Sequence, residues 1–205
     1  MAYSIDAITD DCYSGTTCLI NKLGIQDENM LAETEAAIIL GKVSLLEQSP
    51  IPGDFDFDHY KRIHHFLFCD LYDWAGEIRT IDISKKGTAF VAANKIVDCA
   101  SACFSRMAAF QTDGLTHRAL AEEVADLYHT VNMLHPFREG NGRTQRVFFT
   151  QWLRHLGYDF DLADIDPDVF MIATIFAAQG VMDQLEDFFD QTIHPLQMSR
   201  EITMQ

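Results

Sequence analysis

Residues 135–146 read His-Pro-Phe-Arg-Glu-Gly-Asn-Gly-Arg-Thr-Gln-Arg, and the rest of the chain is organised around this stretch. Apolar residues recur at three- and four-residue steps before it (Leu120, Val124, Leu127, Val131, Leu134) and after it (Val147, Phe148, Trp152, Leu156). That spacing predicts a helix on each side. Pro136 disfavours helical geometry at the residue before it. The stretch is therefore expected to end one helix, form a tight loop and begin the next helix.

The loop carries the residue types that bind phosphate. Gly140, Asn141 and Gly142 can turn successive backbone N–H groups toward one point, and such a nest at a helix N-terminus attracts anions. Arg143 and Arg146 lie three residues apart, so they share a face of the second helix. Their side chains lean back toward the N-terminus of that helix, where a phosphate would lie. The sequence predicts a phosphate-binding loop here.

Two further residues of the stretch carry chemistry. Glu139 is a hard oxygen ligand beside the glycines, which suits Mg²⁺ shared with nucleotide phosphates. His135 is a candidate general base, because an imidazole titrates near neutral pH. The ordinary interpretation of each residue alone is structural, since single histidines at helix ends and single Gly-Asn-Gly turns are common. Their joint occurrence favours a catalytic site.

These residues carry a family resemblance. The stretch resembles the Fic-domain signature, His-x-Phe-x-(Asp/Glu)-Gly-Asn-Gly-Arg-x-x-Arg, and matches it at every fixed position. Residues 70–79, Asp-Leu-Tyr-Asp-Trp-Ala-Gly-Glu-Ile-Arg, resemble the segment that leads into the family's substrate-docking flap. A weaker likeness runs from about Tyr13 to about Ile193. The resemblance implies an all-α fold, a Fic-type helical bundle with one short β-hairpin flap, as a single domain over residues 1–205.

The resemblance also implies an activity, the transfer of AMP from ATP to a Ser, Thr or Tyr hydroxyl of a target protein. His135 would take the proton of the hydroxyl as it attacks the α-phosphate, and pyrophosphate would leave. Glu139 would hold Mg²⁺. The loop Gly140-Asn141-Gly142 and Arg143 would bind the phosphates, with Arg146 at the outermost one.

Further site residues follow from the same resemblance. Asn132 matches a position that lines the nucleotide site, although a hydrogen-bonding role at the helix end fits it equally. The flap is expected over about residues 77–91, and Ile81, Ile83 and Phe90 would dock the target. Lys86, at the turn of the flap, would reach the nucleotide or the target.

Gly142 bears on the group transferred. The related Doc toxins carry lysine at this position and move a phosphate, so Gly142 favours nucleotidyl transfer. Transfer of UMP, GMP or phosphocholine stays open, because the choice of base lies outside the signature. A non-catalytic binding module that uses the hairpin and an acidic face is the rival from another class. An intact His135 and Glu139 argue against it.

Regulation is predicted from a missing motif. Many Fic proteins carry an inhibitory helix of pattern (Ser/Thr)-x-x-x-Glu-(Gly/Asn), whose glutamate pairs with the second signature arginine. Here Glu28-Asn29 is preceded at the required position by Gly24, which does not fit the pattern. The resemblance then implies a toxin held in check by a separate small antitoxin, whose inhibitory glutamate would approach Arg146. Relaxed or absent control is the other possibility.

Composition limits the remaining possibilities. The 205 residues carry a formal net charge of -16, which argues against binding to nucleic acid or to anionic membranes. No apolar run long enough for a membrane span and no signal peptide is expected. The five cysteines form no Cys-x-x-Cys pair and are interpreted as reduced thiols of a cytoplasmic protein, with delivery to a host cell left open.

Six to eight helices are expected in all. Asp27 is predicted to cap the first, and Cys99 and Cys103 to be buried in the third. His59, His64 and His65 lack metal-ligand spacing, so they are expected to be structural or solvent-facing. Strands are expected at 81–84 and 89–91, and helices at 28–48, 55–72, 93–110, from about 115 to the signature, 142–155 and from 166 to about 193 with a break near Gly180.

Overall fold

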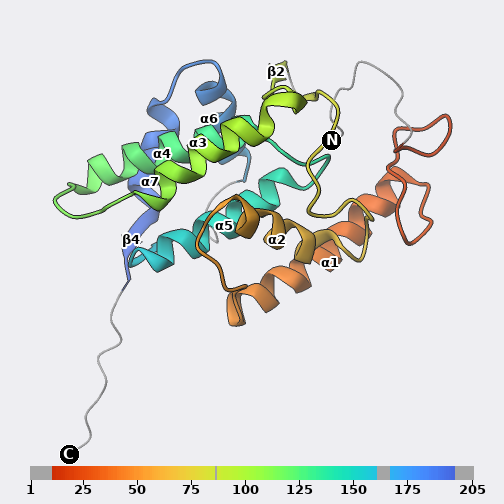
Figure 1. Ribbon diagram of the computed structural model, residues 1–205, viewed down its shortest axis with the longest axis horizontal. Helices are drawn as coiled ribbons and strands as arrows, with labels where there is room; N and C mark the ends of the chain where they lie inside the picture. Colours follow the sequence, from red (N-terminus) through yellow and green to blue (C-terminus); the bar gives the residue numbers. More distant parts are fainter. Residues whose placement is uncertain (1–10, 86, 161–166, 197–205) are drawn as a thin grey trace, which may run out of the picture.

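The computed structural model describes residues 11–85, 87–160 and 167–196, and α-helices dominate it (Figure 1). The α-helices are α1 Glu28–Gln48, α2 Phe57–Phe68, α3 Ile96–Ala108, α4 His117–Leu134, α5 Asn141–His155, α6 Pro167–Ala178 and α7 Asp183–Thr192. A short 3-10 helix, Ala93–Lys95, precedes α3. The all-α prediction is confirmed, and the break near Gly180 separates α6 from α7.

Short polar side chains begin three of these helices, and the predicted cap Asp27 is one of them. Asp27 accepts a hydrogen bond from the Met30 N–H at 2.8 Å, and Thr116 accepts one from Ala119 at the start of α4. Asp56 caps α2 in the same way, so α2 begins at Phe57 and not at Phe55. It ends at Phe68, four residues before the expected end. A side-chain oxygen at the N-cap satisfies an N–H that the helix leaves unpaired.

Two antiparallel pairs of strands accompany the helices. β1 Ser84–Lys85 pairs with β2 Thr88–Ala89 as the expected hairpin, but each strand has only two residues. The alternation at residues 81–83 does not form a strand, because Asp82 instead accepts a hydrogen bond from the Ala93 N–H. β3 Tyr158–Phe160 pairs with β4 Ile193–Pro195, which corrects the expectation of a single hairpin. These strands are distant in sequence, so no local turn signal announces their pairing.

α5 forms the centre of the molecule and contacts α2, α4 and β3, while α4 also packs on α3, α6 and α7 (Figure 1). Phe148 and Phe149 on α5 are fully buried. α1 lies against α2 at the other side of the bundle. This arrangement brings the N-terminus of α5, where the signature lies, next to α2 and α1.

Burial on two helices differs from what apolar character alone would give. On α1, Leu45 is exposed while Leu46 and the acidic Glu35 face inward. On α3, Cys103 is buried as expected, but Cys99 is exposed. All five cysteines are free thiols. Among the described residues, none of the helices combines the length and the apolar character that a membrane span requires.

Candidate active site

His135 caps the C-terminus of α4 in a left-handed conformation, with φ 41° and ψ 59°. Its own N–H donates to the Val131 carbonyl, which completes the last turn of the helix. Pro136 follows, so the chain leaves the helix axis at this point. A non-glycine residue with positive φ is uncommon and is a frequent mark of functional loops. The predicted helix end at His135 is confirmed.

The orientation of the His135 imidazole fixes its tautomer. Nδ1 lies 2.9 Å from the Asn132 carbonyl oxygen, which only accepts hydrogen bonds, so Nδ1 carries the proton and donates. Nε2 is then the basic nitrogen of the ring. The Phe90 ring stacks on the imidazole with centroids 3.7 Å apart and planes 12° apart. His135 is only 6 % exposed between Phe90 and the core.

This environment keeps His135 neutral. Burial, helped by the nearby cations Lys85 and Arg79 and opposed by the hydrogen bond to Asn132, lowers the pKa of His135 to about 3. At pH 7 the imidazole therefore holds no extra proton, and Nε2 can accept one. The low pKa makes it a weak base until negative charge is placed beside it.

The loop after His135 is closed by one side chain. Asn141 accepts a hydrogen bond from the Phe137 N–H through Oδ1 and donates one to the Phe137 carbonyl through Nδ2, both at 2.8 Å. Gly140 has φ +79°, and a side chain there would overlap the Phe68 ring. Gly142 lies in the first turn of α5, and nothing is close to the place where its side chain would be except Arg146 at 3.8 Å. The loop thus leaves room over Gly142 and none at Gly140.

His64 on α2 positions this loop, a role that the sequence reading did not assign. Its Nδ1 accepts a hydrogen bond from the Gly76 N–H, so Nε2 carries the proton and donates to the Glu139 carbonyl at 3.0 Å. Burial lowers the pKa of His64 to about 3, so the ring is neutral. The expectation of a structural histidine is consistent with this, but no spacing in the sequence connects His64 to Glu139.

Glu139, Arg143 and Arg146 mark the entrance to α5. Oε1 of Glu139 accepts a hydrogen bond from the Gly140 N–H at 2.8 Å and lies 3.5 Å from Nη2 of Arg143. Arg143 pairs more closely with Glu35, at 2.5 Å. Arg146 is exposed, and it has no ion-pair partner within the described part of the chain. The loop therefore presents one carboxylate and two guanidinium groups around a helix N-terminus.

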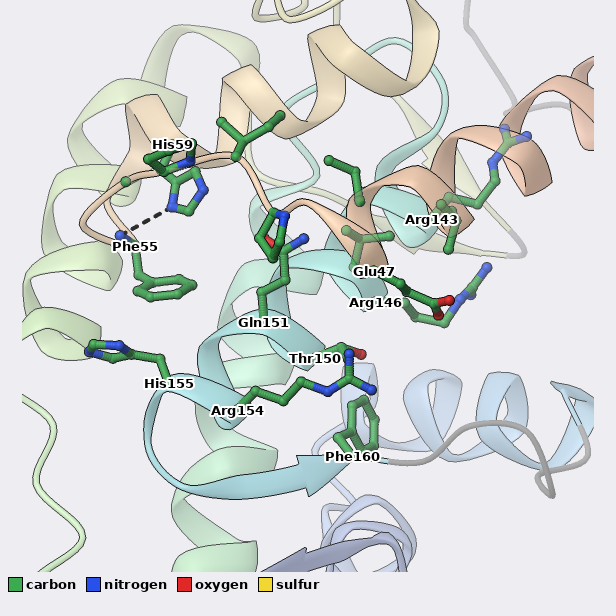
Figure 2. Close-up of a pocket in the computed structure, with 17 residues that line it drawn as sticks. Glu47, Phe55, His59, Arg143, Arg146, Thr150, Gln151, Arg154, His155 and Phe160 are labelled. Carbon is green, nitrogen blue, oxygen red and sulfur yellow. Dashed lines mark hydrogen bonds between the residues drawn. The ribbon is translucent and has the colours of Figure 1, made fainter. Parts of the chain in front are cut away.

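A pocket of about 730 Å³ extends from these arginines along α5 (Figure 2). One wall carries Arg146, Thr150, Gln151 and Arg154, and Phe160 of β3 lies at the same side. The facing wall consists of the C-terminal part of α1 and the segment 50–53, and is largely apolar. In a chain with net charge -16, this pocket gathers positive charge.

The flap is tied to the signature by Arg79, which the sequence analysis did not single out. Arg79 is 5 % exposed and donates through Nε to the His135 carbonyl at 2.8 Å, through Nη1 to Ile81 and through Nη2 to Val91. Backbone N–H groups of Arg79 and Val91 donate to the carbonyls of Pro136 and Met133. One buried guanidinium thus binds both ends of the flap to the signature loop.

The other predicted flap residues differ in their exposure. Ile83 is buried, Ile81 is partly exposed, and Phe90 covers His135. Lys86 lies outside the described residues. Asn132 contributes its backbone carbonyl to His135, which fits the helix-end alternative for this residue.

The sequence of the chain is similar to those of known proteins. Residues 54–153 match the Fic/DOC family, a range that contains the flap and the signature loop. The chain is 36% identical over 172 residues to the probable protein adenylyltransferase y4lH of Sinorhizobium fredii, covering 82% of this chain and 88% of that protein. The chain belongs to the Fic/DOC family.

Other Fic proteins are similar to this chain in sequence and in fold. The chain is 32% identical to the protein adenylyltransferase VbhT of Bartonella schoenbuchensis over 91% of its own length and 39% of VbhT. The crystal structure of BepC from Bartonella tribocorum with bound AMPPNP superposes with a TM-score of 0.85 at 28% identity, covering 91% of this chain and 97% of that one. A Fic domain from Bartonella quintana with bound ADP gives a TM-score of 0.84 at 27% identity, covering 91% and 95%.

Proposed function

We propose that this Fic protein is a protein adenylyltransferase, which transfers AMP from ATP to a Ser, Thr or Tyr hydroxyl of a target protein. The observation that carries the proposal is the state of His135: a neutral imidazole with Nδ1–H donated to Asn132 and Nε2 left as the base, beside a loop built for phosphate. Relatives named as protein adenylyltransferases, and a Fic effector structure with bound AMPPNP, support it.

In this mechanism, Nε2 of His135 takes the proton as the target hydroxyl oxygen attacks the α-phosphorus. A bond forms between that oxygen and phosphorus, the bond from phosphorus to the bridging oxygen breaks, and pyrophosphate leaves. Bound triphosphate would place negative charge near the imidazole and raise the pKa of His135, which makes Nε2 a stronger base. The proton then passes from His135 to solvent.

The start of α5 would bind the phosphates. The N–H groups of the first turn and the helix dipole favour an anion, and the open space over Gly142 lets a phosphate approach the backbone. Arg143 and Arg146 would contact the β- and γ-phosphates, since one guanidinium group can donate two parallel hydrogen bonds to a phosphate. These contacts offset the charge that develops as pyrophosphate leaves.

Glu139 fits the one metal ion that this chemistry uses. Within the described residues no three His, Cys, Asp or Glu side chains lie together as a metal site, so a purely protein-held cation is not supported. Mg²⁺ commonly takes one carboxylate together with substrate phosphates. Glu139 would provide that carboxylate oxygen, and Mg²⁺ would neutralise phosphate charge.

The target protein would bind along the flap. β1 and β2 form a two-stranded sheet with two residues in each strand. An extended segment of the target would add to this sheet as a further strand at its edge. Ile81 and Phe90 are partly exposed and would contact the target side chains, with Ile83 supporting them from below. Phe90 would also bring the hydroxyl next to His135, on which it stacks.

The test is incubation of the purified protein with Mg²⁺ and α-labelled ATP in a cell lysate, with His135→Ala as control. We expect label on a lysate protein or on the chain itself, and a loss of about a hundredfold or more without His135. If only γ-labelled ATP or another labelled nucleotide gives a labelled product, the same site transfers a different group, and the proposal of AMP transfer is wrong. Nucleotide binding without label from any donor would favour a non-catalytic binding module.

The second part of the proposal is that the protein is a toxin inhibited by a separate antitoxin protein. The pocket beside Arg146 has an apolar wall and a cationic wall, so it fits an amphipathic segment of a small partner that carries a glutamate. That glutamate would pair with Arg146, which is exposed. With reduced cysteines throughout, we place the protein in the cytoplasm.

The antitoxin proposal is tested by the activity of the purified chain. We expect AMP transfer without removal of any segment. A chain that is inactive until its own terminus is cut away would contradict a separate inhibitor. A synthetic helix bearing one glutamate, selected for binding to the chain, should lose affinity with Arg146→Ala and keep most of it with Arg106→Ala, which changes an exposed arginine elsewhere.

A further inference from the structure

A buried carboxylate from α1 contacts the first signature arginine. Glu35 is 7 % exposed, although it lies on the first helix, far before the signature in the sequence. One of its oxygens lies 2.5 Å from Nη2 of Arg143, and the other accepts a hydrogen bond from the Tyr72 hydroxyl at 2.5 Å. Both carboxylate oxygens are therefore engaged.

Burial of an acidic side chain in a helix requires a compensating partner. An unpaired carboxylate away from water costs several kcal/mol, whereas one with a cation and a hydroxyl on its two oxygens is satisfied. Tyr72 is itself fixed, because it stacks on Trp74 with centroids 4.4 Å apart. Burial and the neighbouring Glu35 raise the pKa of Tyr72 strongly, so its hydroxyl stays a donor. Glu35 thus has a fixed place in the core.

Arg143 is held on a second side as well. Its guanidinium carbon lies 4.9 Å from the centroid of the Phe68 ring, the same ring that fills the space beside Gly140. The contact with Glu35 uses Nη2, and a guanidinium carries further N–H groups on Nε and Nη1. The side chain is therefore fixed with donors left for a ligand.

We propose that Glu35 is a positioning residue for nucleotide binding, which holds the guanidinium of Arg143 ready for a phosphate. This inference rests on the proposed function, because it assigns Arg143 to the phosphates. A free arginine side chain loses rotamer entropy when it is fixed on a ligand. Glu35 and Phe68 impose that cost during folding, so phosphate binds an arginine that is already oriented.

The test is the affinity for ATP with Mg²⁺, measured by calorimetry on the intact chain. Glu35→Gln keeps the shape of the side chain and removes its charge. We expect ATP to bind about tenfold more weakly, a change of about 1.4 kcal/mol. Glu33→Gln, on the exposed face of the same helix, should leave the affinity within about twofold of the wild type. An unchanged or tighter ATP affinity in Glu35→Gln would overturn the proposal, since it would mean that Glu35 is idle or competes with phosphate.

A double-mutant cycle separates positioning from a general structural role. If Glu35 acts through Arg143, Glu35→Gln should have no further effect on ATP affinity in an Arg143→Ala background. Equal losses in both backgrounds would show that Glu35 supports the fold alone and would overturn the proposal. Arg143→Ala with wild-type ATP affinity would instead remove the assignment of Arg143 to the phosphates, so the two failures are distinguishable.

Tyr72→Phe gives an independent check in case Glu35→Gln unfolds. It removes one hydrogen bond from Glu35 and leaves the ion pair with Arg143. We expect a lower melting temperature with ATP affinity within about twofold of the wild type. A loss of ATP affinity of about tenfold or more in Tyr72→Phe would contradict a role carried by the ion pair.

Discussion

The signature loop and the flap meet at His135, but they are built in different ways. The loop is fixed from within and from below: Asn141 bonds both backbone groups of Phe137, His64 holds the Glu139 carbonyl, and Phe68 fills the space beside Gly140. The flap has two strands of two residues each, and Arg79 binds it at its base. The proposed phosphate site, which is rigid, and the proposed target-binding flap thus lie side by side.

The difference shows what each region has to do. A phosphate site must hold its donors in place before the ligand arrives, so its polar groups are buried and paired. A flap that accepts an extended peptide needs an edge with backbone groups available. Only the base of the flap needs fixing, and a single buried arginine with three carbonyl acceptors does this.

The largest effect is expected from Gly140→Ala. A side chain at φ +79° is strained, and it would overlap the Phe68 ring, so we expect a loss of about 3 kcal/mol in unfolding free energy together with nucleotide binding. Chemical denaturation measures the loss. Gly142→Ala is the matched control, because its position is helical and open, and it should change stability by less than about 1 kcal/mol. Equal destabilisation by both would contradict the rigid-loop description.

Arg79→Lys tests the attachment of the flap. A single ammonium cannot donate to three carbonyls, so we expect a loss of about 2 to 3 kcal/mol in stability and weaker labelling of the target, with ATP affinity retained. Labelling of the target at several target concentrations, beside calorimetry with ATP, separates the two. Arg106→Lys, at an exposed pair with Asp126, should change neither. Loss of ATP affinity with Arg79→Lys would show that flap and loop form one unit.

The loop should also become less stable in acid. His64 has a pKa of about 3 in the folded chain, below the 6.5 of a free histidine, so the unfolded chain takes up a proton first as the pH falls. Stability is then lost from about pH 6.5 downward, by about 2 kcal/mol at pH 5 for this residue. Denaturation at several pH values should show a shallower dependence in His64→Gln. An unchanged pH dependence in His64→Gln would contradict this contribution of His64.

The smallest effect is expected where the two regions touch. Phe90→Ala would uncover the His135 imidazole and so reduce the burial that lowers its pKa, and we expect that pKa to rise by about one unit. An NMR titration of the imidazole measures the rise. Phe176→Ala, on the exposed side of α6, should leave it unchanged. An unchanged pKa in Phe90→Ala would show that the core alone, without the flap, desolvates the imidazole.

The amino-acid sequence by itself determined the local features. Apolar spacing and the capping residue Asp27 predicted the helices, and the spacing of His135, Glu139, Arg143 and Arg146 predicted the loop, because these signals act over a few residues. The helix ends near Phe55 and Tyr72 were wrong where caps and turns competed with apolar periodicity.

Only the tertiary structure decided which distant groups serve that loop. Glu35, His64 and Arg79 come from three other parts of the chain, and each is a polar residue that sequence patterns place at the surface or leave without a role. The pairing of β3 with β4 is also a tertiary contact, because α6 and α7 separate the two strands in the sequence. A buried polar side chain needs a hydrogen-bond or ion-pair partner, and the fold supplies that partner. The partner can come from any part of the chain, so local sequence patterns do not identify it.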